Sequence, residues 1–122
     1  MPDPTCPFCQ TPLDEHPANR CLDAWVATCA GWHQVDLSFG RIPWGLPPGQ
    51  AEPPITKVPM FSIDIDAAFT LVEDRDYHFS RCTEEAPSRH HMAVLDGAIE
   101  FGHELPEAIT KAFIAALEGE TP

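Results

Sequence analysis

Three cysteines and one histidine lie close together near the start of the chain, with the spacing C-x2-C-x6-H-x4-C over Cys6, Cys9, His16 and Cys21. The run Cys6-Pro-Phe-Cys9 is a short loop that can point two thiolates at one ion, and tetrahedral zinc then needs two further ligands. His16 and Cys21 are the nearest donors. We therefore predict a Zn2+ site held by these four side chains. Because four protein ligands leave no open coordination position, we expect the zinc to be structural rather than catalytic.

The spacing is similar to that of the CCHC zinc knuckle, which has two fewer residues in its middle gap. Zinc knuckles often bind nucleic acid, but only Phe8 and Arg20 supply an aromatic and a basic side chain close to this site. Cys21 falls in the first turn of a predicted helix, whose dipole should lower the pKa of the thiol. Two alternatives stay open: a reduced segment without metal, with Cys21 facing the core, or a ligand set that includes Cys29 or His33. Cys29 falls on the apolar helix face, which favours a small core residue.

The size and charge of the chain limit the classes of function. Its 122 residues suffice for one domain with a core that needs no disulfide framework. The 19 acidic and 7 basic residues give a net charge of −12, which argues against direct nucleic-acid binding because a phosphate backbone needs clustered Lys and Arg. An acidic surface aids solubility, suits a basic protein partner, or mimics nucleic acid.

The cysteine count and the absence of long apolar runs indicate a reducing compartment. The cysteines number five, which is odd, and this argues against a fully paired disulfide scaffold. The sequence shows no signal-peptide pattern and no run of ~20 apolar residues that could span a bilayer. We therefore expect a cytoplasmic protein without membrane contact, in which thiols favour metal over disulfides.

Apolar residues recur at i, i+3, i+4 and i+7 in three segments, the pattern of amphipathic helices. Asn19 suits the N-cap of the first helix and Gly31 its end, while Gly119 should end the third. Ser62 or Asp64 can cap the second. The expected helices span residues 18–31, 62–74 and 105–118.

Period-two alternation predicts strands between these helices. Asp96-Gly97 is a strong hairpin signal, so the strands on either side of it should pair antiparallel. The expected strands span residues 32–39, 76–84, 90–95 and 98–104. Together with the helices they define an α+β fold.

Residues 40–60 are rich in proline, which rules out both a helix and a central strand across this span. A loop of this length is often functional, and apolar side chains on a stiff loop can mark a binding surface. The alternative is a loop that packs back on the domain and covers an edge. The candidate partner-binding residues are Trp44, Leu46, Ile55 and Val58.

Four further histidines, with nearby acids, raise the question of a second metal site or a catalytic site. His90 and His91 should point to opposite faces of a strand, so they cannot easily share one ion. His78 and His103 add no ligand spacing that a metal set requires. We therefore interpret these histidines as surface or partly packed residues. Cys82 has no base held near it in sequence, which favours a small buried residue.

Three helix motifs, in order, resemble the phage ABA sandwich domain, a family of small bacteriophage proteins. The match covers residues 18–119. Its motifs are Asn-Arg-Cys-Leu-Asp-Ala-Trp-Val (19–26) with Gly31-Trp32, then Phe-Ser-Ile-Asp-Ile-Asp-Ala-Ala-Phe-Thr-Leu-Val-Glu (61–73), and Leu-Pro-Glu-Ala-Ile-Thr-Lys-Ala-Phe (105–113).

The resemblance implies an α/β/α sandwich with a small antiparallel sheet of three to four strands and three helices, encoded by a phage or prophage. It implies no activity and no catalytic residues. The zinc-knuckle-like segment, residues 1–17, lies outside the common core, and the Pro-rich loop 40–60 is longer than the family leads us to expect.

We therefore expect a small accessory protein that acts in the host cytoplasm by binding a host or phage protein, for example a defence factor. One alternative is a zinc-dependent hydrolase or nuclease, which would need an open metal position and a carboxylate base. The other is an acidic nucleic-acid mimic, which would need its acids on one face.

Overall fold

A computed structural model gives the fold, and the description covers residues 4–37, 43–49, 54–81 and 91–120. Ten elements follow one another along these ranges: η1 (Leu13–Glu15), α1 (Arg20–Cys29), β1 (His33–Asp36), β2 (Trp44–Leu46), β3 (Thr56–Lys57), α2 (Ile65–Phe69), β4 (Tyr77–Arg81), β5 (His91–Leu95), β6 (Ala98–Gly102) and α3 (Leu105–Glu120).

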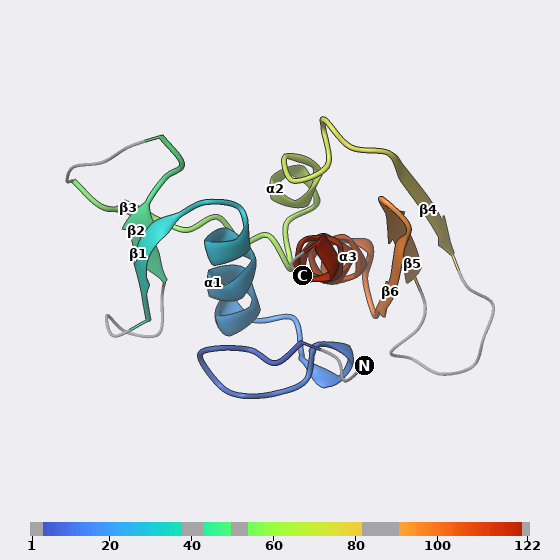
Figure 1. The fold of residues 1–122 in the computed structure, drawn as a ribbon, viewed down its shortest axis with the longest axis horizontal. Helices are drawn as coiled ribbons and strands as arrows, with labels where there is room; N and C mark the ends of the chain where they lie inside the picture. The colour runs from blue at the N-terminus through green and yellow to red at the C-terminus, as the bar shows by residue number, and fades with distance from the viewer. Residues whose placement is uncertain (1–3, 38–42, 50–53, 82–90, 121–122) are drawn as a thin grey trace.

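The strands form two antiparallel sheets of three, ordered β1-β2-β3 and β4-β5-β6. Helix α3 packs on β5 and β6, while α1 and α2 pack on α3 and α1 also contacts β1. Figure 1 shows the helices between the two sheets. The predicted α+β class, with three helices, is confirmed. The strands are divided between two sheets, with helices between them, where one sheet of three to four strands between helices was expected.

Helix α1 begins and ends where its sequence signals indicate. The side chain of Asn19 accepts a hydrogen bond from the Leu22 N–H at 3.0 Å. At the other end Gly31 has φ of +102°, and the Trp32 N–H donates to the Ala27 carbonyl at 3.0 Å. This is the Schellman arrangement, in which the left-handed position favours glycine because it has no Cβ. The predicted cap and stop are thus confirmed.

The other two helices differ in length from the prediction. Helix α2 is short because Leu71 and Val72 donate to carbonyls three residues back, which tightens the chain into turns after Phe69. Both residues are still buried. Helix α3 continues through Gly119 to Glu120. A single glycine costs a helix only about 1 kcal/mol, so Gly119 does not by itself end it.

The hairpin between β5 and β6 has the predicted turn. Asp96 and Gly97 both have positive φ, 49° and 89°, as a type I′ turn requires. Gly102, at the end of β6, lies against the first turn of α3, where an added Cβ would be 2.7 Å from the Ala108 nitrogen. Glycine therefore lets α3 approach the sheet closely.

The Pro-rich segment contributes the central strand of the first sheet. Trp44–Leu46 pairs with β1 on one side and with β3 on the other. The expectation that the prolines exclude a central strand is wrong. Pro43 and Pro47 flank the strand instead of occupying it, so every residue within β2 keeps its N–H group.

A buried carboxylate joins α1 to the segment that precedes α2. Asp23 is fully buried and accepts from the Ser62 N–H at 2.7 Å and from Arg20 Nη1 at 2.7 Å. Arg20 also donates to the Val58 carbonyl. Burial raises the pKa of Asp23, although the hydrogen bonds from Ser62 oppose it.

Among the helices of the described ranges, none is long and apolar enough to cross a membrane.

Candidate metal centre

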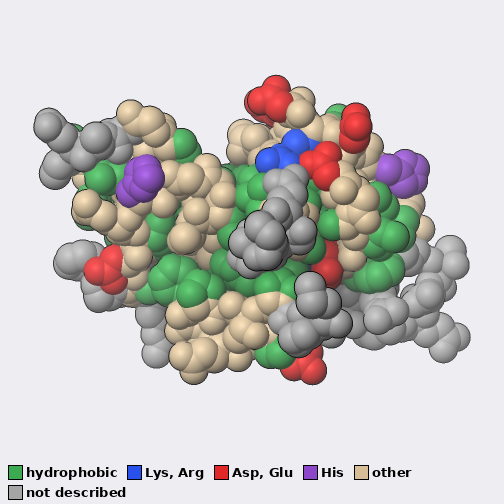
Figure 2. All heavy atoms as spheres, in the orientation of Figure 1, with side chains coloured by type: hydrophobic (Ala, Val, Ile, Leu, Met, Phe, Trp, Pro, Cys, Tyr) green, Lys and Arg blue, Asp and Glu red, His purple; other side chains and the backbone are tan. Residues whose placement is uncertain are grey.

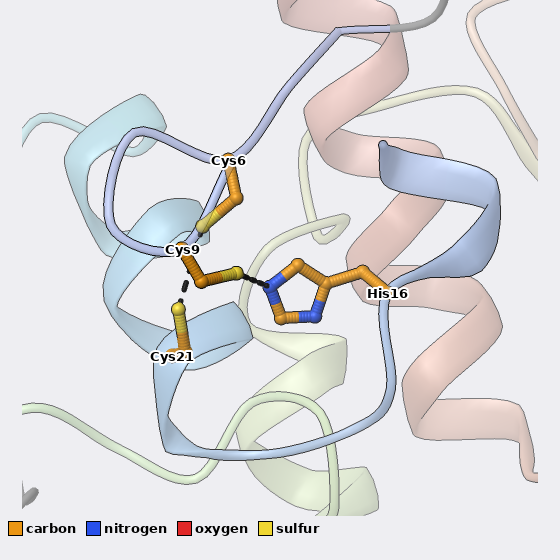
Figure 3. Close-up of side chains that lie close together, drawn as sticks. All are labelled: Cys6, Cys9, His16 and Cys21. Atoms are coloured by element: carbon orange, nitrogen blue, oxygen red, sulfur yellow. Dashed lines mark hydrogen bonds between the residues drawn. The ribbon is translucent and has the colours of Figure 1, made fainter. Parts of the chain in front are cut away.

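A tight loop brings the first two cysteines together. Residues 5 and 12 form an isolated antiparallel bridge. Between them the Cys6 N–H donates to the Thr11 carbonyl at 3.0 Å, and the Gln10 N–H donates to the Cys6 carbonyl at 2.8 Å. Gln10 has φ of +63°, which turns the chain back after Cys9. The loop therefore points the side chains of Cys6 and Cys9 toward the first turn of α1 (Figure 3).

All four predicted ligands meet at this place. The Sγ atoms of Cys6, Cys9 and Cys21 and a ring nitrogen of His16 lie within 4.8 Å of one another. Cys6 Sγ is 3.4 Å from Cys21 Sγ, and Cys9 Sγ is 3.3 Å from His16 Nε2. Tetrahedral zinc, with bonds of about 2.3 Å to sulfur and 2.0 Å to nitrogen, separates its ligand atoms by about 3.5–3.8 Å. The donor set suits one such ion, with two separations slightly below this range and all of them within 4.8 Å.

The histidine is held in the form that binds metal. His16 Nδ1 lies 2.8 Å from the Pro17 carbonyl, which can only accept, so Nδ1 carries the proton. Nε2 then has no proton, so its lone pair can bind a metal ion, and this atom faces Cys9. The side chain is only 1% exposed, and burial lowers its pKa, which favours the neutral ring. A metal-binding histidine commonly donates its second N–H to a carbonyl in this way.

The three thiols differ in their environment. Burial raises the pKa of Cys6, which accepts from the Phe8 N–H at 3.4 Å. Burial acts in the same direction on exposed Cys9, but hydrogen bonds, first those with Thr11, outweigh it and lower the pKa of this thiol. Burial, and then the neighbouring thiols, raise the pKa of Cys21 strongly. A bound cation would lower the pKa values of these thiols, because metal binding displaces the thiol protons.

The outcome at Cys21 corrects one expectation. The residue lies in the first turn of α1, as predicted, but its pKa is raised and not lowered. Burial and the two neighbouring sulfurs disfavour the thiolate and outweigh the effect that we expected from the helix dipole. A thiolate at this position therefore depends on a cation.

The alternative ligands are not part of the cluster. Cys29 lies at the far end of α1, and His33 is exposed at the start of β1. Within the ranges that the structure describes, the four predicted residues are the one group of His, Cys, Asp and Glu close enough to share an ion.

The remaining histidines are scattered. His78 pairs with Val94 across the second sheet, and His91 pairs with Arg81 on the opposite face. The exposed side chain of His103 is 3.3 Å from Glu107 Oε1, at the start of α3. His90 and Cys82 lie outside the described residues.

Half of the predicted partner surface lies in the interior. Leu46 and Val58 are 2% and 1% exposed, so they cannot contact a partner, and this part of the prediction is wrong. Ile55 is 43% exposed and Trp44 is half-buried. The segment packs back on the domain because β2 is a central strand, which is the alternative that the sequence left open.

Sequence reasoning missed a buried ion pair close to the metal centre. Glu107 and Lys111, one turn apart on α3, are both buried, with Oε2 and Nζ 3.1 Å apart. Glu107 also accepts from the His103 N–H at 3.1 Å. Their charges act on His16. Glu and Lys at i, i+4 are visible in the sequence, but this spacing is typical of exposed helix faces.

Fold and site together define an α+β protein with a Cys3His cluster of metal-binding side chains close to its N-terminus. Comparisons with protein-family models, with curated proteins and with solved structures found no match to this chain.

Proposed function

We propose that Cys6, Cys9, His16 and Cys21 bind one structural zinc ion, and that the protein acts by binding another protein. The observation that carries the metal assignment is the convergence of three sulfurs and one imidazole nitrogen within 4.8 Å. Soft thiolates with imidazole suit zinc, and four protein ligands fill its tetrahedral coordination. No position is then left for a catalytic water, so the role of the ion is structural.

The zinc would fasten the N-terminal segment to the core. Cys6 and Leu13 are buried core residues, and η1 contacts α3. The segment is short and has little regular structure of its own, so its own hydrogen bonds hold it weakly. A metal that joins Cys6 and Cys9 to Cys21 links it to α1.

The action by binding rests on charge and on the helix motifs. A net charge of −12 favours a basic protein partner. The resemblance of the three helix motifs to small phage proteins supports an accessory role for a phage or prophage, in the host cytoplasm. The partner would be a host or phage protein, such as a defence factor.

The metal assignment predicts one zinc per chain in native mass spectrometry. The Cys9→Ser variant should lose it at equal free zinc, because a hydroxyl cannot replace a thiolate as a soft ligand. The matched control is Cys29→Ser, which removes a thiol outside the cluster and should keep one zinc. Zinc retained in the Cys9 variant, or absent from the native protein, would contradict the assignment.

The proposed action predicts a defined partner in bacterial lysate. Zinc-loaded protein is immobilised, crosslinked to lysates from several hosts, and its captured proteins are quantified against an equally acidic, unrelated bait. We expect one protein to be enriched and its purified form to bind at defined stoichiometry. If no purified candidate binds, the binding role is wrong.

A further inference from the structure

A cavity of about 620 Å³ opens beside the helices, and none of the four candidate metal ligands lines it. It lies between the end of α1, the turns after α2, and α3. Figure 2 shows hydrophobic side chains in the middle of this face and charged side chains along one side of them. Its volume falls in the range of ligand pockets, about 300–1,000 Å³. The apolar part of its lining includes Ala30, Trp32, Phe61, Leu71 and Phe113.

The charged side of the cavity has more acid than base. Three carboxylates line it, those of Asp74, Asp76 and Asp96, together with one base, Arg75. Arg75 Nη1 is 2.6 Å from Asp96 Oδ2, so these two charges neutralise each other. Among the residues that the structure describes, neither Asp74 nor Asp76 forms an ion pair. Two uncompensated carboxylates therefore border the cavity.

The pocket already shows how it holds a guanidinium group. The Arg75 guanidinium lies 5.1 Å above the centre of the Phe113 ring while it binds Asp96. This combines a cation–π contact with an ion pair. A second cation could form ion pairs with the carboxylates of Asp74 and Asp76. An apolar side chain next to that cation in the ligand would then cover the hydrophobic floor of the cavity. An anionic ligand would meet the acidic border and the net charge of −12.

We propose that this cavity binds an Arg or Lys side chain, together with an adjacent bulky apolar side chain, from a segment of a partner protein. The assignment rests on the proposed protein-binding function, and charge complementarity selects the occupant. Nothing in it depends on a reaction at the metal centre. The cavity thus names the chemistry by which the partner is recognised.

The test is a nuclear magnetic resonance titration of zinc-loaded, 15N-labelled protein with acetyl-phenylalanyl-arginine amide at 150 mM salt. We expect saturable amide shifts around residues 70–76, 96–97 and 113, with a Kd on the order of 1 mM. The citrulline analogue, which has the same shape without the charge, should not saturate. Free 2-phenylethylamine serves as a cation without a peptide, and we expect it to bind more weakly.

Charge-neutral variants locate the effect. The double variant Asp74→Asn with Asp76→Asn should lower the affinity for the peptide by about fivefold or more, since two ion pairs are lost. The matched control, Asp64→Asn with Asp66→Asn, removes the same charge at the start of α2 and should keep the affinity within about twofold. Asp64 caps α2 by accepting from the Asp66 N–H at 3.0 Å, and Asn at residue 64 can accept the same hydrogen bond.

Several results would overturn the proposal. These are shifts outside the cavity, no saturation, equal binding of the citrulline peptide, equal loss in both double variants, or tighter binding of the free amine. The lysate experiment separates this proposal from the proposed function. A purified partner that binds both double variants like the native protein would remove the cavity assignment and leave the protein-binding function. Peptide binding without any partner would remove the function and the assignment to a protein ligand.

Discussion

Removal of zinc with EDTA is expected to lower the melting temperature of the protein by roughly 10 to 20 °C. A metal that binds only the folded state stabilises it by about 4 kcal/mol when its free concentration is 1,000 times its Kd. For a domain of this size, 1 kcal/mol corresponds to about 3–5 °C. The proposed zinc ion joins the N-terminal segment to α1 through its four ligands. Its removal therefore frees core residues of that segment such as Leu13. Circular dichroism melts in buffered zinc and in EDTA measure the difference.

Two variants separate the metal from other effects of the chelator. Cys21→Ser should melt at the same temperature with and without EDTA, because it has already lost a ligand. Cys29→Ser should respond as the native protein does. A native melting temperature that EDTA does not change, in protein shown to release its metal, would mean that the ion contributes nothing to stability.

Replacing Lys111 by Met should reduce the free energy of unfolding by about 3–5 kcal/mol, the usual cost of leaving one member of a buried ion pair alone. Glu107 would then remain in the interior without its cation, and its hydrogen-bond partners among the described residues would be the N–H and the exposed ring of His103. The volume and the apolar stem of the side chain are nearly preserved, so packing changes little. Urea unfolding at saturating zinc measures the effect apart from any change in metal affinity.

The exposed ion pair of the same chain is the natural control. Arg75 and Asp96 have partly exposed side chains, and Arg75→Met should cost only about 0–1 kcal/mol. In addition, the double variant Lys111→Met with Glu107→Gln should recover part of the loss, because neither member of this pair then carries a charge. Equal effects of Lys111→Met and Arg75→Met would show that burial adds nothing to the pair near His16.

Local signals were sufficient for much of the structure. The N-cap at Asn19, the helix end at Gly31 and the hairpin at Asp96-Gly97 depend on a few neighbouring residues, and all three predictions are confirmed. The group of four candidate metal ligands is also a feature that local signals predict. Its ligands are close in sequence, and a short loop leaves few ways to arrange them, so spacing and residue type predict the site.

Features that depend on distant segments could not be predicted in this way. Proline positions argued against a strand at Trp44–Leu46, and only the pairing with β1 and β3 places it at the centre of a sheet. Val58 looked available to a partner, but it is buried in the core. The charges of Glu107 and Lys111 gave no sign of burial. In each case tertiary packing decided the outcome, and a periodic pattern does not encode it.

Because α1 packs on α3, the core can form only late during synthesis of the chain. All four metal ligands precede residue 22, whereas the helix that completes the core begins at Leu105. During synthesis the ligand set is therefore complete while most of the chain is still untranslated. Core closure has to wait for the last helix, because contacts between α1 and α3 span most of the sequence. A zinc ion held by these four residues, as proposed, would therefore constrain the chain before α3 is made.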